Sequence, residues 1–186
     1  MTVKDIIKTT ATLLNRQDII DYINGTYFQE DSDTIKAVEK LNELLNLVIN
    51  ELCLAYVPMV KTEEVAVTNG KIYYNSFSER AVNVLEVLDA NQKALGFTLK
   101  ADHLILPNNA SYVKYAYIPK KYSLEDEVGY TEKEISSRAL SFGLCSEFCI
   151  TESEFDKAVM WHERYMDAIK EVCLPKLKKI KARSWN

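Results

Sequence analysis

The strongest constraint on the fold is a pair of amphipathic helical patterns, separated by a short break, within residues 139–170. The segments 131–134 and 151–154 both read Thr-x-x-Glu, in which a hydroxyl and a carboxylate each satisfy a free backbone N–H at a helix start. We therefore expect one helix that starts at Thr131 and continues through 134–150, about four to five turns at ~3.6 residues per turn, and a second helix after the break. Two amphipathic helices with so short a connection fold back on each other, so the pattern predicts a packing module and not a reaction centre.

The second helix has an apolar face whose members recur at intervals of three and four residues. This face comprises Phe155, Ala158, Val159, His162, Tyr165, Met166, Ile169 and Val172. We expect the helical hairpin to be packed by Phe155, Val159, Trp161, His162, Tyr165 and Ile169. If Trp161 and Tyr165 are buried, each should contribute about 3 kcal/mol to stability, the typical loss on truncating a large aromatic side chain.

Two shorter helices are predicted near the N-terminus. Residues 3–14 carry apolar side chains at helical spacing, and the segment 2–5 (Thr-x-x-Asp) resembles a capping box with the shorter acid. Asn15 offers a second cap, for a short helix that stops at the Asn-Gly dipeptide 24–25.

A longer helix is predicted over residues 33–56, where apolar residues alternate at three- and four-residue steps. About 23 residues of helix would span ~35 Å. Additional leucines and isoleucines widen the apolar stripe, which indicates burial against more than one neighbour, within the subunit or across a subunit boundary. Pro58 ends this helix, because the residue before a proline is pushed out of helical geometry.

In residues 60–117 the helical spacing of apolar residues gives way to a pattern that predicts short β-strands. The strand-like runs are rich in β-branched and aromatic residues and lie at 65–67, 72–74, 82–87, 95–99, 104–106 and 112–118. The Asn-Gly dipeptide 69–70 is a strong hairpin turn, residues 89–92 are turn-like, and 107–109 separate the last two runs. The expected fold class is α+β, in which N-terminal helices and a C-terminal helical hairpin flank a small antiparallel sheet or sandwich.

The chain should form one composite domain with three parts: N-terminal helices (1–58), a β-rich insertion (59–119), and the hairpin with a basic tail (120–186). At 186 residues and 47% hydrophobic composition it can bury a substantial core. No window approaches the roughly 18 uninterrupted apolar residues of a membrane helix, so we expect no membrane contact. Charged residues interrupt the first ten positions, and we expect no export by the general secretory route and four reduced cysteines.

The formal net charge of −4 argues against a surface that binds nucleic acid over its whole extent, because neutralising phosphates requires a basic face. The exception is the C-terminus, where Glu171 is the only acidic residue among many basic ones. The residues of this basic tail that we assign to partner docking are Lys176, Leu177, Lys178, Lys179, Ile180, Lys181, Arg183 and Trp185. Their charges are compatible with three roles: complementing a helix dipole, contacting phosphates, or docking on an acidic partner.

Few residues offer catalytic or metal-binding chemistry. The two histidines, His103 and His162, are interpreted as a turn residue and a packed interface residue. Cys145 and Cys149 share a helix face and could bind one metal ion with His162 or Cys173, but small buried thiols are the preferred interpretation. No phosphate-binding loop, zinc-protease motif or nucleophile elbow occurs. We therefore expect no catalytic site, no metal and no cofactor.

The order of elements is similar to that of a known family. A tyrosine-dense strand with a proline (residues 112–130) precedes a helix with Gly143-x-x-x-Glu147 and then the pattern Phe-Asp-x-Ala-x-x-Trp-x-x-x-Tyr-x-x-Ala over 155–168. This arrangement resembles the head-to-tail connector, or adaptor, proteins of tailed bacteriophages, over about residues 1–175. The strand-rich middle departs from the mainly helical members of such families.

The resemblance implies a structural virion protein, made in the bacterial host cytoplasm and located in the neck of the particle. Such a subunit would form a homo-oligomeric ring, commonly dodecameric, that connects the portal to the tail or to a second ring protein. Its C-terminal tail would dock on the portal, and genomic DNA would pass through the lumen without sequence-specific binding. No enzymatic activity is implied.

Two alternatives from other classes stay open. A cytoplasmic DNA-binding or regulatory protein could use the basic C-terminus on phosphates, and its affinity would then fall steeply with rising salt. An enzyme of unrecognised type would have to depend on the two histidines.

Overall fold

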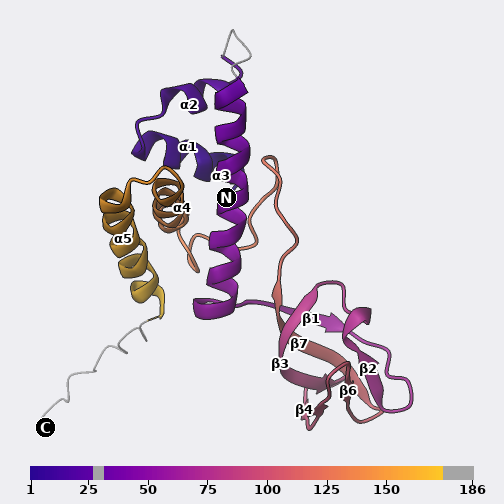
Figure 1. Ribbon diagram of the computed structural model, residues 1–186. Helices are drawn as coiled ribbons and strands as arrows, with labels where there is room; N and C mark the ends of the chain where they lie inside the picture. The colour runs from indigo at the N-terminus through magenta and orange to yellow at the C-terminus, as the bar shows by residue number, and fades with distance from the viewer. Residues whose placement is uncertain (27–31, 174–186) are drawn as a thin grey trace, which may run out of the picture.

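A computed structural model describes residues 1–26 and 32–173, and these residues form an α+β fold, as predicted from the sequence (Figure 1). Helices from both ends of the chain flank two small antiparallel sheets. The helices are α1 (Val3–Leu13), α2 (Gln17–Asn24), α3 (Ser32–Glu51), α4 (Ser137–Thr151) and α5 (Phe155–Cys173). The strands are β1 (Met59–Glu64), β2 (Lys71–Tyr73), β3 (Arg80–Asp89), β4 (Ala94–Leu95), β5 (Thr98–Leu99), β6 (His103–Ile105) and β7 (Ala110–Ile118).

The predicted start of α1 is confirmed, and that of α2 is wrong. Thr2 caps α1, because its hydroxyl oxygen accepts a hydrogen bond of 3.1 Å from the backbone N–H of Asp5. Asn15 does not cap α2; it adopts a left-handed conformation with φ 57°, and Arg16 takes the N-cap position without a side-chain hydrogen bond that caps the helix. At the other end of α2, Gly25 has φ 71°, which is the expected left-handed helix stop.

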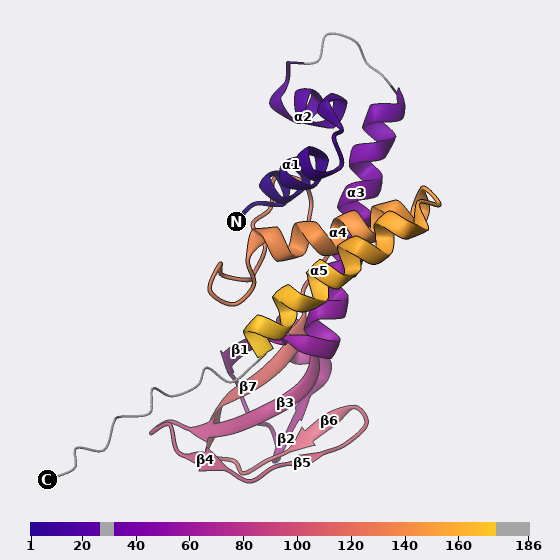
Figure 2. The ribbon, with the colours of Figure 1, turned by 90° about the vertical axis from the view of Figure 1, so that its left-hand side faces the viewer.

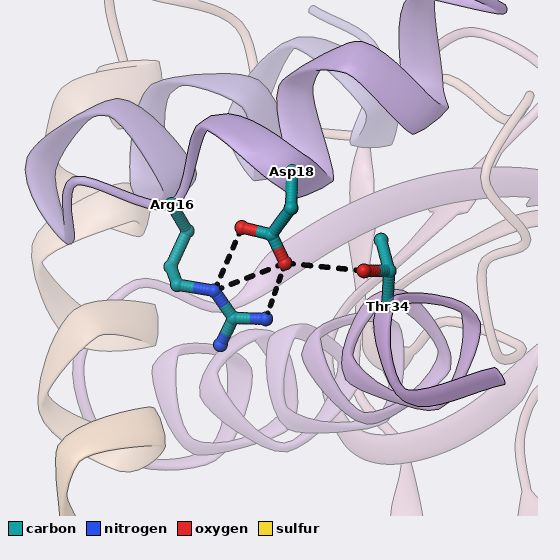
Figure 3. Close-up of polar contacts among 3 residues, drawn as sticks. All are labelled: Arg16, Asp18 and Thr34. Carbon is teal, nitrogen blue, oxygen red and sulfur yellow. Dashed lines mark hydrogen bonds and ion pairs between the residues drawn. The ribbon is translucent and has the colours of Figure 1, made fainter. Parts of the chain in front are cut away.

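Arg16 and Asp18 bind each other at the start of α2 and tie it to α3 (Figure 3). The guanidinium donates from Nε at 2.9 Å and from Nη2 at 2.6 Å to the two carboxylate oxygens, and the hydroxyl of Thr34 donates to the same carboxylate at 3.2 Å. The hydrogen bond from Arg16 is the largest cause that lowers the pKa of Asp18 below 3.8. Both charged side chains are about one-third exposed, so solvent screens the pair.

Asp18→Asn should therefore lower the free energy of unfolding by about 1 kcal/mol at pH 7. The folded state holds the pKa of this carboxyl below its ordinary value, so its contribution is present above pH 3.8 and is lost as the pH falls through the folded pKa. Urea unfolding at a series of pH values should show the variant and the parent converging in acid. Glu39→Gln, which removes an exposed carboxylate from α3, is the control and should be nearly neutral. A constant deficit at all pH values would contradict the assignment.

Helix α3 ends earlier than predicted. Regular α-helix stops at Glu51, and residues Leu52–Tyr56 form a π-helical turn before the chain enters β1. Pro58 lies two residues after this turn, and Val57 before it leaves helical geometry, so the helix does not continue. The buried side of α3 packs Leu41, Leu45 and Val48 into the main core, while Leu47 of α3 is 57% exposed and Leu54 of the π-helical turn is 59% exposed.

The β-rich part consists of two sheets with the strand orders β1-β7-β3-β4 and β2-β6-β5. The Asn-Gly turn at 69–70 is present, with φ 52° and 69°, and hydrogen bonds between the backbones of Thr68 and Lys71 close it. The side chain of Asp89 accepts from the backbone N–H groups of Asn91 and Lys93 and builds the β3–β4 turn. The strand predicted at 65–67 is absent, because this segment lies between β1 and the turn and belongs to neither sheet.

The sheets and the helices have separate hydrophobic cores. Side chains of the β-rich part, such as Val87, Leu104, Val113 and Tyr115, form one core. The main helical core includes residues of α1 to α4, two residues of α5 and Met59 at the start of β1. A small third cluster between α4 and α5 consists of Cys145, Cys149, Ala158 and Trp161. Figure 1 shows the sheets beyond the C-terminal end of α3, joined to the helices where β1 leaves and β7 returns.

The starts of both C-terminal helices differ from the prediction. Glu134 does accept from the backbone N–H of Thr131 at 2.9 Å, but this pair closes an isolated turn. Helix α4 begins at Ser137, and the hydroxyl of Ser136 caps it by accepting from the N–H of Ala139. Thr151 is the last residue of α4, and its hydroxyl donates to the carbonyl of Phe148, so the break lies at 152–154.

Candidate assembly surface

The hairpin of α4 and α5 packs on α3, and Gly143 of α4 lies in this contact. Figure 2 shows α4 and α5 side by side with α3 behind them, and α4 contacts both other helices. A Cβ atom at Gly143 would lie 2.9 Å from the ring of Tyr165 and 2.9 Å from Cγ1 of Val48. Such distances are shorter than real carbon contacts. The absence of a side chain at Gly143 therefore allows α3, α4 and the ring from α5 to meet at one point.

The buried face of α5 comprises Ala158, Trp161, Tyr165 and Ile169. Trp161 is 7% exposed and stacks on Phe142 of α4, with ring centroids 5.7 Å apart, while the guanidinium of Arg164 lies 4.9 Å from the centre of the indole. Near the break, the hydroxyl of Ser146 donates to the carbonyl of Ala158 at 3.0 Å. Of the predicted packing residues, Trp161, Tyr165 and Ile169 therefore lie in the hairpin interface.

The other three predicted packing residues, Phe155, Val159 and His162, lie outside it. Phe155 is 63% and Val159 59% exposed, and His162 is exposed as well. Successive helix residues are about 100° apart, so Val159 and His162, each one residue after a member of the buried face, turn away from it, while Phe155 is the first residue of α5. The periodicity of the sequence covers both faces, and only the packing of α4 selects one of them.

These exposed residues line a groove between the end of α4 and the start of α5. The groove has a volume of about 440 Å³ and is lined by Ser146, Ile150, Phe155, Ala158, Val159, His162 and Glu163. Most of the side chains that line the groove are apolar. The groove is open to solvent, and Ile150 in its wall is 46% exposed. An exposed apolar patch rimmed by polar groups is typical of a protein–protein contact site.

The carboxylate of Glu147, on α4, lies near His162 of the groove. Burial raises the pKa of Glu147, the negative charge of Glu51 raises it further, and His162 opposes the shift. Glu163 lines the groove itself. Within residues 1–26 and 32–173, none of Glu51, Glu147 and Glu163 forms a salt bridge. The groove is thus mainly apolar and has one carboxylate, that of Glu163, in its lining.

The basic tail predicted for partner docking, Lys176 to Trp185, lies outside the described residues. The structure describes the chain as far as Cys173, at the C-terminal end of α5. The assignment of the basic tail to partner docking stays a prediction.

The residues considered for metal binding are not brought together. Cys145 and Cys149 are buried, whereas Cys173 is exposed at the far end of α5. Burial raises the pKa of Cys145 to about 12, which favours the neutral thiol over a metal-binding thiolate. In the described ranges no group of three histidine, cysteine or carboxylate side chains is arranged to hold a metal ion. His103 contacts Asp102 through Nδ1 at 2.6 Å in the β-rich part.

The chain matches no protein-family model and no curated protein sequence. Among the helices of residues 1–26 and 32–173, none is both long and apolar enough to cross a bilayer.

Proposed function

We propose that this protein is a structural subunit of a phage neck, which forms a homo-oligomeric ring between the portal and the tail or a second ring protein. The observation that supports this most directly is the exposed apolar groove of the helical hairpin, because a monomer gains nothing from leaving Ile150, Phe155 and Val159 in water. A closed ring needs a surface of this kind on every subunit.

In this proposal the groove serves the contact between subunits, and the basic tail docks on the portal. The net charge of −4 suits a conduit through which DNA passes without being held. The subunit would be made in the host cytoplasm, act in the virion without a cofactor, and catalyse no reaction. A dodecamer is the stoichiometry that the family resemblance suggests.

Phe155→Asp should weaken ring formation while leaving the subunit folded, because Phe155 is 63% exposed. If the groove is a central contact, the loss per interface should be about 2 kcal/mol, or roughly thirtyfold in affinity. Size-exclusion chromatography with multi-angle scattering, in the presence of the portal protein of the same genome, measures the assembly. Met160→Asp changes an exposed residue on another side of α5 and is the matched control. A parent chain that stays monomeric and never binds portal would refute the proposal.

A further inference from the structure

The most exposed apolar side chains form two pairs on different helices. Among residues 1–26 and 32–173, the four most exposed large apolar side chains are Phe155 (63%), Val159 (59%), Leu54 (59%) and Leu47 (57%). Phe155 and Val159 line the groove between α4 and α5. Leu47 belongs to α3, and Leu54 to the π-helical turn that follows it. We propose that the groove of one copy receives Leu47 and Leu54 of a second copy, an inference that rests on the proposed ring and names the surface that meets the groove.

The groove and Leu47 lie on different sides of α3. A Cβ atom at Gly143 of α4 would lie 2.9 Å from Val48, so Val48 marks the side of α3 on which the hairpin packs. Leu47 borders another groove, of about 460 Å³, which α3 forms with residues 121–123. Figure 1 shows the hairpin on one side of α3 and the segment that follows β7 on the other. The two apolar surfaces of one chain therefore cannot meet each other, but those of two copies can.

A contact between two unlike surfaces is the kind that a ring requires. When a patch meets the same patch of a second copy, the contact is two-fold symmetric and the assembly is complete with two subunits. When the groove of one copy meets the leucines of the next, each end of the growing assembly still has one free surface. The contact then repeats until the last copy meets the first.

The charges beside the two surfaces are opposite in sign. Glu163 is the carboxylate in the lining of the α4–α5 groove, and Lys121 is the cation in the lining of the groove beside Leu47. Within the described ranges neither of them forms a salt bridge. When Leu47 enters the groove of the next copy, Lys121 lies against Glu163. Opposite charges at the rim of an apolar contact favour one orientation of the two partners over others.

Cross-linking between introduced thiols tests the contact in the full-length chain. Leu47→Cys and Val159→Cys are prepared singly and together in a Cys173→Ser background, because Cys173 is exposed and the other three cysteines are buried. Each chain is treated with a short bis-maleimide under the conditions used for light scattering, with the portal protein present, and is separated by denaturing electrophoresis. The pair Leu99→Cys and Val159→Cys is the matched control, since Leu99 in the β-rich part is 53% exposed.

The chain with thiols at 47 and 159 should give a ladder of covalent oligomers, because every subunit is linked to two neighbours. Each single variant alone should stay a monomer, and an equimolar mixture of the two should give a dimer and nothing larger. The control pair should give no ladder. Links within one single variant would show that like surfaces meet, and they would overturn the inference. Assembly by light scattering without links between 47 and 159 would overturn this contact alone, whereas a parent chain that never assembles would refute the ring as well.

Charge reversal gives a second measurement that leaves the apolar side chains in place. Lys121→Glu and Glu163→Lys should each weaken the association of subunits about tenfold, because each brings like charges together across the contact. The chain with both changes should recover most of the affinity, because the pair is restored with its signs exchanged. Single variants that assemble as tightly as the parent, or a double variant no tighter than the single ones, would contradict the placement of Lys121 against Glu163.

Discussion

Tyr165→Ala should lower the free energy of unfolding by about 3 kcal/mol, the cost of removing a large buried aromatic ring. Tyr165 is 2% exposed, and its ring fills the space left by Gly143, so its removal opens a cavity between α3, α4 and α5. Urea unfolding followed by far-ultraviolet circular dichroism measures the change. The expected loss is a large fraction of the stability of a domain of this size.

Two controls separate the ring of Tyr165 from other causes. The hydroxyl is buried without a hydrogen-bond partner among the described residues, so Tyr165→Phe should change stability by less than about 0.5 kcal/mol or increase it. Phe155→Ala removes an aromatic residue of the same helix that is largely exposed, and it should cost little. Equal losses for Phe155→Ala and Tyr165→Ala would contradict the observed orientation of α5.

Gly143→Ala should also destabilise the protein, by about 2 kcal/mol, although alanine is the better helix former by about 1 kcal/mol. The added methyl group would meet Val48 and the ring of Tyr165 at 2.9 Å, so the hairpin must move away from α3. Thermal unfolding measures the shift in midpoint.

Gly96→Ala is the matched control for this substitution, because a Cβ atom there would have no neighbour within 4 Å outside the adjoining residues of the chain. It should be neutral or slightly stabilising through a lower entropy of the unfolded chain. A Gly143→Ala variant as stable as the parent would show that the three helices can repack without loss of stability. The close approach at Gly143 would then not contribute to stability.

The two expected losses matter for function because they act on the scaffold of the groove. Phe155 and Val159 are exposed only while Trp161 and Tyr165 hold the opposite face of α5 against the hairpin. A change in that packing would rotate α5 and redistribute the apolar side chains between core and surface. Stability variants and assembly variants should therefore be compared at temperatures where all of them are folded.

Much of the fold followed from local patterns. The Thr2 cap, the stop at Gly25 and the Asn-Gly turn each depend on a few neighbouring residues, and the structure contains all three. The Thr-x-x-Glu motifs at 131–134 and 151–154 were misleading. Glu134 accepts from the backbone N–H of Thr131 in an isolated turn, and the hydroxyl of Thr151 donates to the carbonyl of Phe148 at the end of a helix. A capping motif indicates that a helix boundary is near and does not fix on which side the helix lies.

The sequence could not identify the groove. The pattern of α5 contains two overlapping apolar faces, one with Trp161 and Tyr165 and one with Phe155 and Val159, and both satisfy a helical period. A possible signal was the presence of small residues on α4, since Gly143 marks where another helix must approach closely. The sequence does not show which side chain approaches Gly143, and only the structure identifies it as the ring of Tyr165.

The sequence by itself determined the α+β class, the order of helices and strands and the surplus of positive charge at the C-terminus, because these depend on local spacing and composition. Only the tertiary structure decided which side of α5 is buried, which apolar residues stay in water and which carboxylates gather near them. Burial depends on contacts between segments far apart in the chain, such as α3 with the helical hairpin, and no local pattern encodes their relative rotation.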